Sequence, residues 1–355
     1  MNSRQRLLAA ITGGTPDRLP CAPQLGVAMA VEMPPEEWDA LRTRCDVTPT
    51  MSILGDPDVF GGQGYIDHKR VTRSGADTII TVDTPKGTLR SVHHATPEAS
   101  WTLEHLFKDG ADVERMLSIP YEPPAVDASP YLAWEERLGD DGLLALGICS
   151  SFRFVYGALG SQAIYELIAD DVDLVEQVIA ETSRRLMIYL ERCLDAGVRS
   201  FWMGGAEHLG PGVVHPRHFR RLAVPYDQPA VALIHARGGI VNYHQHGKLK
   251  DILDDIAEIG PDVLSPVETG LRGDVTLAEA KARLAGKVCV KGNLDDMAFL
   301  ALATEEEVRE AARDCIAQAA EGGGYILSGT DAGVYSPEWV KSFLVMADVA
   351  AEYTY

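Results

Sequence analysis

The sequence is poor in positive charge. It contains 32 Lys and Arg residues against 52 Asp and Glu residues, which gives a formal net charge of −20, and no block of consecutive basic residues interrupts this pattern. A surface of this kind cannot neutralise the phosphates of a nucleic acid or of anionic lipids. We therefore expect neither nucleic acid nor a membrane surface among its partners.

Long apolar runs are also absent. No segment approaches the roughly 18 consecutive apolar residues of a membrane-spanning helix. Near the start of the chain, the apolar run covers only residues 7–11 before a Thr-Gly-Gly turn, and such a run is too short for the core of a signal peptide. These absences predict a cytoplasmic protein.

Cysteine is scarce and scattered. The chain has six cysteines, and no two of them form a Cys-x-x-Cys pair. This spacing argues against both a disulfide framework and a zinc site built from thiolates. Any metal site must therefore use histidine and carboxylate side chains.

What the sequence does contain is a repeated alternation of short apolar runs and segments of helical periodicity, typical of βα units around a parallel sheet. The expected strands cover residues 19–25, 142–150, 198–205, 238–244, 262–268, 287–293 and 324–330, and the expected helices cover 172–197, 216–236, 248–258, 276–284, 304–320 and 336–352. The strand count approaches eight, so we predict a (β/α)8 TIM barrel. A doubly wound open sheet is the alternative.

Residues 64–105 have a different pattern, with β-type alternation broken by Ser74-Gly75 and by Pro85-Lys86-Gly87. Turn residues between alternating runs predict a β-meander. We interpret the meander as an elaboration near the N-terminus of one barrel domain that covers residues 1–355.

Polar side chains gather where the expected strands end, and the carboxyl ends of barrel strands are where chemistry is found. His244 and His246 are two residues apart, so on an extended segment they point the same way, and Glu268 follows the next strand. Two imidazoles and one carboxylate form a zinc ligand set that leaves a position open for substrate or water. The alternative is a pair of histidines that binds substrate without metal.

Three further residues are candidates for the site. Glu207 follows a Gly-Gly pair at a strand end and is a candidate site carboxylate. Asp331 follows Gly329-Thr330 and is either a site carboxylate or a helix cap. Arg153 is suited to binding a substrate carboxylate, or it pairs with one of the many surface acids.

Four segments of the chain, in order, resemble the uroporphyrinogen decarboxylase superfamily. They are RQRLLAAITGGTPDRLPCAP, HPRHFRRLAVPYDQPAVALIHARGGIVNYHQHG, GDVTLAEAKARLAGKVCVKGNLDD and GGYILSGTDAGVYSPEWV. The resemblance covers nearly the whole chain. It implies a (β/α)8 barrel and one of two chemistries, which are metal-free decarboxylation of uroporphyrinogen and zinc-dependent methyl transfer involving a corrinoid protein.

The chain departs from both branches of this superfamily. The Arg-rich segment by which the decarboxylase holds its substrate is replaced by Gln-Leu-Gly-Val-Ala at residues 24–28. The methyltransferase branch carries His-x-Cys and a late Cys, and related cobalamin-independent methionine synthases add a Glu. Here His244 and Glu268 match the His and the Glu, His246 occupies the first Cys position, and the late Cys position falls near residues 330–331.

A ligand set of nitrogen and oxygen is harder than one with thiolates and suits an oxygen ligand on the metal. We therefore expect a zinc-dependent methyltransferase or demethylase that moves a methyl group from a small O-methyl or N-methyl donor to a corrinoid supplied by a partner protein. Glu207 and Asn293 would orient the substrate, and Tyr243 or Asp331 would protonate the leaving oxygen. The resemblance is also compatible with a homodimer.

Two other functions stay open at this point. One is a metal-free decarboxylase of a polycarboxylate such as a porphyrinogen, although few cations lie near the expected strand ends. The other is a non-enzymatic binder of a tetrapyrrole or corrinoid, although the chain has no Asp-x-His-x-x-Gly motif for a corrinoid ligand.

Overall fold

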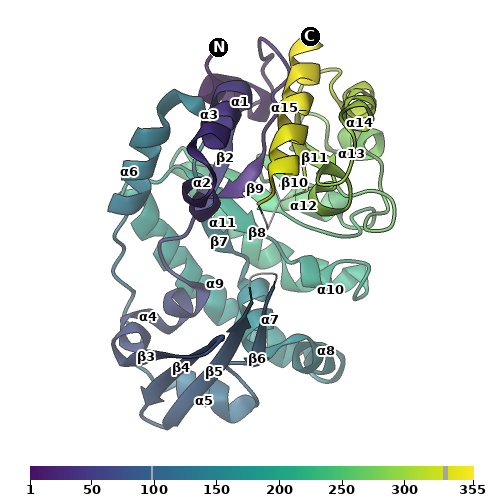
Figure 1. Ribbon diagram of the computed structural model, residues 1–355. Helices are drawn as coiled ribbons and strands as arrows, with labels where there is room; N and C mark the ends of the chain where they lie inside the picture. The colour runs from purple at the N-terminus through teal and green to yellow at the C-terminus, as the bar shows by residue number, and fades with distance from the viewer. Residues whose placement is uncertain (97–98, 331–334) are drawn as a thin grey trace. The chain divides into compact units, whose positions relative to one another are not determined.

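The computed structural model describes residues 1–96, 99–330 and 335–355 (Figure 1). The described chain forms two compact units. Unit 1 consists of residues 1–53, 128–148 and 194–355, and unit 2 consists of residues 54–127 and 149–193.

Unit 1 is built on an eight-stranded parallel sheet whose strands follow one another in chain order. They are β1 (Gln24–Gly26), β2 (Thr48–Met51), β7 (Ala145–Cys149), β8 (Ser200–Gly204), β9 (Ile240–His244), β10 (Val263–Ser265), β11 (Cys289–Leu294) and β12 (Tyr325–Gly329). A parallel bridge between Cys21 and Leu327 joins the first strand region to the last. The sheet therefore closes into a (β/α)8 barrel, which confirms the predicted fold and excludes the doubly wound alternative.

The strand that the sequence analysis missed is β2. Proline lacks an N–H and is unfavourable within most strands, so Pro49 hid the signal of this four-residue segment. The strand nevertheless pairs in parallel with both β1 and β7. It supplies the eighth strand of the barrel.

Helices of unit 1 precede, follow and connect the strands. They are α1 (Ser3–Ile11), α2 (Val27–Glu32), α3 (Pro35–Arg44), α6 (Ser129–Leu138), α10 (Pro216–Leu222), α11 (Val224–Ala236), α12 (Leu253–Ile259), α13 (Leu277–Leu284), α14 (Glu305–Ala319) and α15 (Pro337–Glu352). Short helical turns η1 (Gly139–Asp141), η2 (Glu207–Leu209) and η3 (Asp296–Leu300) lie between them.

Two helices differ from the sequence prediction for local reasons. The expected helix over 216–236 is divided at Ala223, because Pro225 has no N–H to continue the hydrogen-bonding pattern. The expected helix over 248–258 begins only at Leu253, since Asp274 accepts hydrogen bonds from the backbone N–H groups of Leu249 and Lys250 and holds that segment in a turn.

Unit 2 combines an antiparallel sheet with five helices. Its strands are β3 (Lys69–Ser74), β4 (Asp77–Thr84), β5 (Gly87–Ala95) and β6 (Ser100–Glu104), and its helices are α4 (Asp56–His68), α5 (Gly110–Leu117), α7 (Ser151–Leu159), α8 (Ser161–Asp170) and α9 (Val172–Asp195). The predicted meander is confirmed from β3 to β6, with turns at Gly75 and before Gly87, both of which have positive φ. Residues 64–68, which were expected within it, belong to α4. The expectation of a single domain stays a prediction.

None of the described helices combines the length and the apolar composition needed to cross a membrane.

Candidate metal centre

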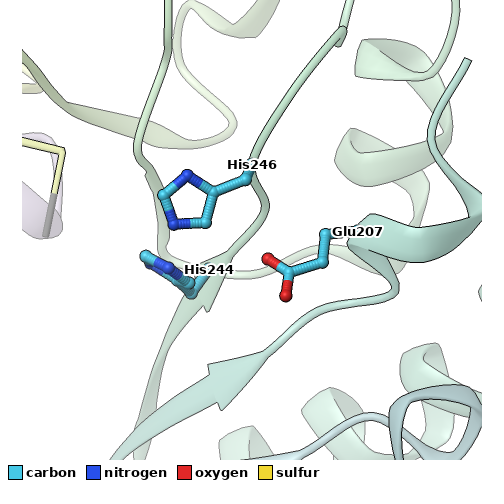
Figure 2. Close-up of side chains that lie close together, drawn as sticks. All are labelled: Glu207, His244 and His246. Carbon is cyan, nitrogen blue, oxygen red and sulfur yellow. The ribbon is translucent and has the colours of Figure 1, made fainter. Parts of the chain in front are cut away.

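Three side chains from neighbouring strand ends of the barrel converge on one point. His244 is the last residue of β9, His246 lies two residues beyond it, and Glu207 lies just after β8. The pairing of Gly204 with His244 sets the two strand ends side by side. One ligand atom from each of these side chains lies within 4.8 Å of the others, and Figure 2 shows the Glu207 carboxylate directed toward both rings.

His244 is buried, with 4% of its surface exposed, and its ring is held on two sides. The hydroxyl oxygen of Ser265 lies 3.5 Å from Nδ1 of His244, and the same hydroxyl donates a hydrogen bond of 2.8 Å to Oδ1 of Asn242. The indole ring of Trp202 lies 4.7 Å from the imidazole, measured between ring centroids. The side chains of Ser265 and Trp202 thus define the ring orientation.

The carboxylate of Glu268 contacts the ring of His246. Its Oε2 lies 3.3 Å from Nδ1 of His246 and also accepts a hydrogen bond of 2.7 Å from the backbone N–H of Gly247. Burial by itself would raise the pKa of this carboxyl, but the hydrogen bonds from His246 and Gly247 and the charge of Arg272 outweigh burial and lower the pKa below its ordinary value. Glu268 is therefore ionised and suited to orient His246.

The turn that carries Glu207 packs closely on β9. The N–H of Gly205 donates a hydrogen bond of 2.7 Å to the carbonyl of His244. A Cβ at Gly205 would lie 2.6 Å from Oε1 of Gln245 and 2.7 Å from the His244 carbonyl oxygen. Only glycine permits this approach, which places Glu207 opposite the two imidazoles.

Tyr243 lies on the other face of β9 from His244, as the alternation of side chains along a strand requires. Its hydroxyl donates a hydrogen bond of 2.8 Å to Asp227 of α11 and accepts a longer one, of 3.4 Å, from the N–H of Ala206. Burial, together with the Asp227 carboxylate, raises the pKa of Tyr243 well above its ordinary value. These contacts fit a positioning role for Tyr243, and the proton-donor role expected from the sequence stays a prediction.

Two of the remaining candidates have other contacts in the described part of the chain. The amide oxygen of Asn293 accepts a hydrogen bond of 3.3 Å from the thiol of Cys315, which lies on α14. Arg153 belongs to α7 of unit 2, where the Ser150 hydroxyl caps its backbone N–H. Asp331 lies outside the described residues.

Comparison with known proteins agrees with this barrel. The uroporphyrinogen decarboxylase (URO-D) family model matches residues 144–337, which is more than half of the chain. The chain belongs to the uroporphyrinogen decarboxylase family. The matched region contains all three members of the cluster, Glu207, His244 and His246.

Curated relatives within this family are distant. A uroporphyrinogen decarboxylase of Paraburkholderia phytofirmans is 30% identical over 138 residues, which cover 36% of this chain and 34% of that protein. The same enzyme of Actinobacillus succinogenes is 26% identical over 196 residues, which cover 54% of this chain and 52% of that protein. The chain therefore spans between a third and about half of the length of these relatives.

Solved structures show the same architecture over a longer range. A methyltransferase from Methanosarcina mazei superposes with a TM-score of 0.66 at 16% identity and covers 98% of both chains. A B12-independent methionine synthase from Shewanella sp. W3-18-1 gives a TM-score of 0.52 at 11% identity, with 89% of this chain and 85% of that chain covered. At these identities the likeness establishes the fold.

Two residues next to the candidate metal ligands were not expected from the sequence. Trp202 lies in β8, two residues before Gly204, and its ring packs on His244, so the alternation of side chains along the strand was the signal that could have identified it. Gln245 lies between the two histidines and is fully buried, and neither its amide nitrogen nor its amide oxygen has a hydrogen-bond partner among the described residues. Burial of this kind has no signal in a single sequence.

Proposed function

We propose that the chain is a divalent-metal-dependent methyltransferase that takes a methyl group from a small O-methyl or N-methyl donor, with a corrinoid on a partner protein as the acceptor. The observation that carries this proposal is the convergence of Glu207, His244 and His246 within 4.8 Å at the carboxyl ends of β8 and β9. The superposition on a methyltransferase over 98% of both chains supports the choice of reaction within the family.

The donor set fits zinc. Zinc sites that take part in catalysis commonly use three protein ligands from histidine and carboxylate side chains and keep a fourth position for substrate or water. Nδ1 of His244 faces Ser265 and Nδ1 of His246 faces Glu268, so Nε2 is the nitrogen that each ring would present to a cation. Glu207 would be the third ligand, and Glu268, expected as a ligand from the sequence, would orient His246.

A zinc ion held by these residues would act as a Lewis acid on the oxygen of the donor and so favour cleavage of its bond to the methyl carbon. The chain's own residues determine how strong this effect is. No cysteine belongs to the cluster among the described residues, and a nitrogen and oxygen set leaves more positive charge on the ion than thiolates do. Ser265 and Glu268 keep both imidazoles in the orientation that binding requires.

Metal analysis and methyl transfer test this proposal. Protein dialysed against zinc should retain about one ion per chain, and His244→Ala should weaken zinc binding by at least about 100-fold, since a ligand contributes more than the 10-fold to 100-fold typical of its hydrogen-bonded supports. His68→Ala, an exposed histidine of unit 2, is the matched control. Transfer from methoxylated donors to reduced cobalamin, followed by its absorbance, should require zinc.

Substoichiometric zinc in the wild type, or equal zinc affinity in His244→Ala and His68→Ala, would contradict the metal site. Methyl transfer that persists with a chelator would contradict its role in the reaction.

Decarboxylation of a polycarboxylate is the second candidate, and the names of the family model and of the curated relatives favour it. The cations of the barrel argue against it. Arg272 lies 3.3 Å from Asp295 and 3.9 Å from Glu268, and Lys291 is buried, donating to Gln24 and Thr48. Release of carbon dioxide from a polycarboxylated tetrapyrrole in the presence of a chelator would establish this second function.

A further inference from the structure

Unit 2 contains a hollow of about 720 Å³, whereas the candidate metal ligands belong to unit 1. All of the residues that line this hollow belong to unit 2, and most of them come from the four helices α5, α7, α8 and α9. Protein pockets that bind small molecules have volumes of about 300 to 1,000 Å³. The size of the hollow therefore fits a small-molecule ligand.

Each of these helices turns an apolar face toward the hollow. On every one of them, two apolar lining residues are four positions apart, which is the spacing of a single helix face. These pairs are Val113 and Leu117 of α5, Val155 and Leu159 of α7, Ala163 and Leu167 of α8, and Leu174 and Val178 of α9. Leu117 is 47% exposed and Leu174 is 44% exposed, so a ligand with an apolar body would gain free energy by covering them.

The charged side chains of the lining are mainly acidic. Lys108 is the one cation among the lining residues, and it lies 3.1 Å from Glu104 and 3.8 Å from Asp112, which balance its charge. The lining also has five carboxylates, which are those of Asp109, Glu114, Glu166, Asp170 and Glu181. An anionic ligand would therefore be repelled from the hollow and a cationic one attracted to it.

Three of the five carboxylates already have partners within unit 2. These are Arg184 and Arg185 for Glu181, Lys86 for Glu114, and the N-terminal turn of α5 for Asp109.

Glu166 and Asp170 differ from these three. Neither of them forms an ion pair with a Lys or Arg side chain in the part of unit 2 that the structure describes, and both are exposed. They are four residues apart on α8, so their carboxylates lie on the same helix face and repel each other. A positive charge beside both of them would relieve this repulsion.

We infer that the hollow of unit 2 binds a small apolar amine in its protonated form. The apolar body lies between the four helices, and the ammonium group lies beside the carboxylates of Glu166 and Asp170. This binding site goes beyond the proposed methyl transfer and does not depend on it.

Three probes of similar size test the inference on the full chain, with ligand-observed NMR at pH 7 as the readout. They are 4-phenylbutylamine, which is cationic, 4-phenylbutan-1-ol, which is neutral, and 4-phenylbutanoate, which is anionic. We expect the amine to bind about threefold to tenfold more tightly than the alcohol, since exposed ion pairs contribute modestly. The carboxylate should bind most weakly. Added salt should reduce the difference between the amine and the alcohol, because it screens exposed charges.

A charge variant locates the ammonium group. The double variant Glu166→Gln with Asp170→Asn should lower the affinity for the amine to that for the alcohol and leave the affinity for the alcohol unchanged. The matched control is Asp67→Asn with Glu191→Gln, which removes two charges from exposed positions of unit 2 outside the lining. The control should keep the preference for the amine.

A size variant locates the apolar body. Ala163→Phe places a larger side chain in the hollow and should cause a loss of affinity for all three probes. Ala169→Phe, at an exposed position of α8 outside the lining, should change none of these affinities. Thermal melts of each variant show whether it is folded.

Equal binding of the amine and the alcohol to the wild type would overturn the inference, as would the absence of saturable binding. So would a preference for the amine that survives in Glu166→Gln with Asp170→Asn, or unchanged binding to folded Ala163→Phe. These measurements use no zinc and no turnover. Failure of the zinc experiments would therefore reject the proposed function and leave the probe results standing.

Discussion

Each unit contains a hollow, and the larger of these two belongs to unit 2, whereas the candidate ligands belong to unit 1. Unit 2 encloses about 720 Å³ between its helices, lined by apolar side chains such as Phe60, Val113, Val155 and Val178. The hollow of unit 1 is about half as large, but it adjoins the Trp202 ring that packs on His244. The candidate metal ligands therefore belong to the unit with the smaller of these two hollows.

Strand direction explains the difference. All eight strands of the barrel are parallel, so their carboxyl ends and the loops after them meet at one mouth. The sheet of unit 2 is antiparallel, and its strand ends alternate between two edges. Only the barrel therefore brings polar side chains from several strand ends to one point.

The largest effect is expected for Gly205→Ala, because Gly205 lies where the turn after β8 packs on β9. The added methyl group would lie 2.6 to 2.7 Å from Gln245, from the His244 carbonyl and from the Tyr243 ring, so β8 must move away from β9. Overpacking of this kind should lower the free energy of unfolding by about 2 kcal/mol and weaken zinc binding. Urea denaturation and calorimetry measure the two effects.

Gly26→Ala is the control, because a Cβ at Gly26 meets nothing within 4 Å. Equal stability of the Gly205→Ala and Gly26→Ala variants would contradict the close packing of the Gly205 turn on β9.

A smaller effect is expected for Glu268→Gln, which keeps the shape of the side chain but removes its charge. Loss of the carboxylate that accepts from His246 should weaken zinc binding by about tenfold, as is typical for groups that orient a metal ligand. Isothermal titration with zinc provides the measurement. A loss as large as that of His244→Ala would instead assign Glu268 as a ligand, as the sequence analysis expected.

The third and smallest effect is expected in unit 2, where Glu181 lines the large hollow. The hydrogen bond from Arg184, aided by Arg185, lowers the pKa of Glu181 to about 2. Because the pKa of Glu181 is lower in the folded state, the ionised carboxylate stabilises the fold at pH values above its ordinary pKa of about 4.5. This contribution to the free energy of unfolding is lost as the pH falls from about 4.5 toward 2. Glu181→Gln should therefore be slightly less stable than the wild type at pH 7 and similar to it at low pH.

Urea midpoints at several pH values from 7 down to about 2 would show this convergence. Zinc affinity should be the same in Glu181→Gln and in the wild type. A change in zinc affinity would instead show that the two units are energetically coupled.

Most of the barrel was predictable because its signals are local. Buried parallel strands have short apolar runs, and the helix over 304–320 begins with a Thr304 and Glu307 capping box that the structure contains. The missed strand β2 and the divided helix at Ala223 both involve proline, whose effect depends on whether a particular N–H is needed. That need is set by neighbours distant in the sequence.

The site was predictable in part for a similar reason. A spacing of two residues places His244 and His246 near each other, and the position of Glu268 after the next strand brings it to His246. The same reasoning could not show that Glu207 reaches both rings, because that depends on a glycine turn packed on β9. Nor could it show that Tyr243 and Asn293 face Asp227 and Cys315.

The sequence by itself determined the acidic composition, the βα alternation and the two histidines at a strand end, because charge, periodicity and spacing are properties of the chain. The tertiary structure decided which carboxylate faces the imidazoles and which one supports them, and it placed four helices of unit 2 around one hollow. Those features arise where strands pair and side chains pack. The pairing of two segments that are distant in the sequence depends on both of them, so neither segment alone predicts it.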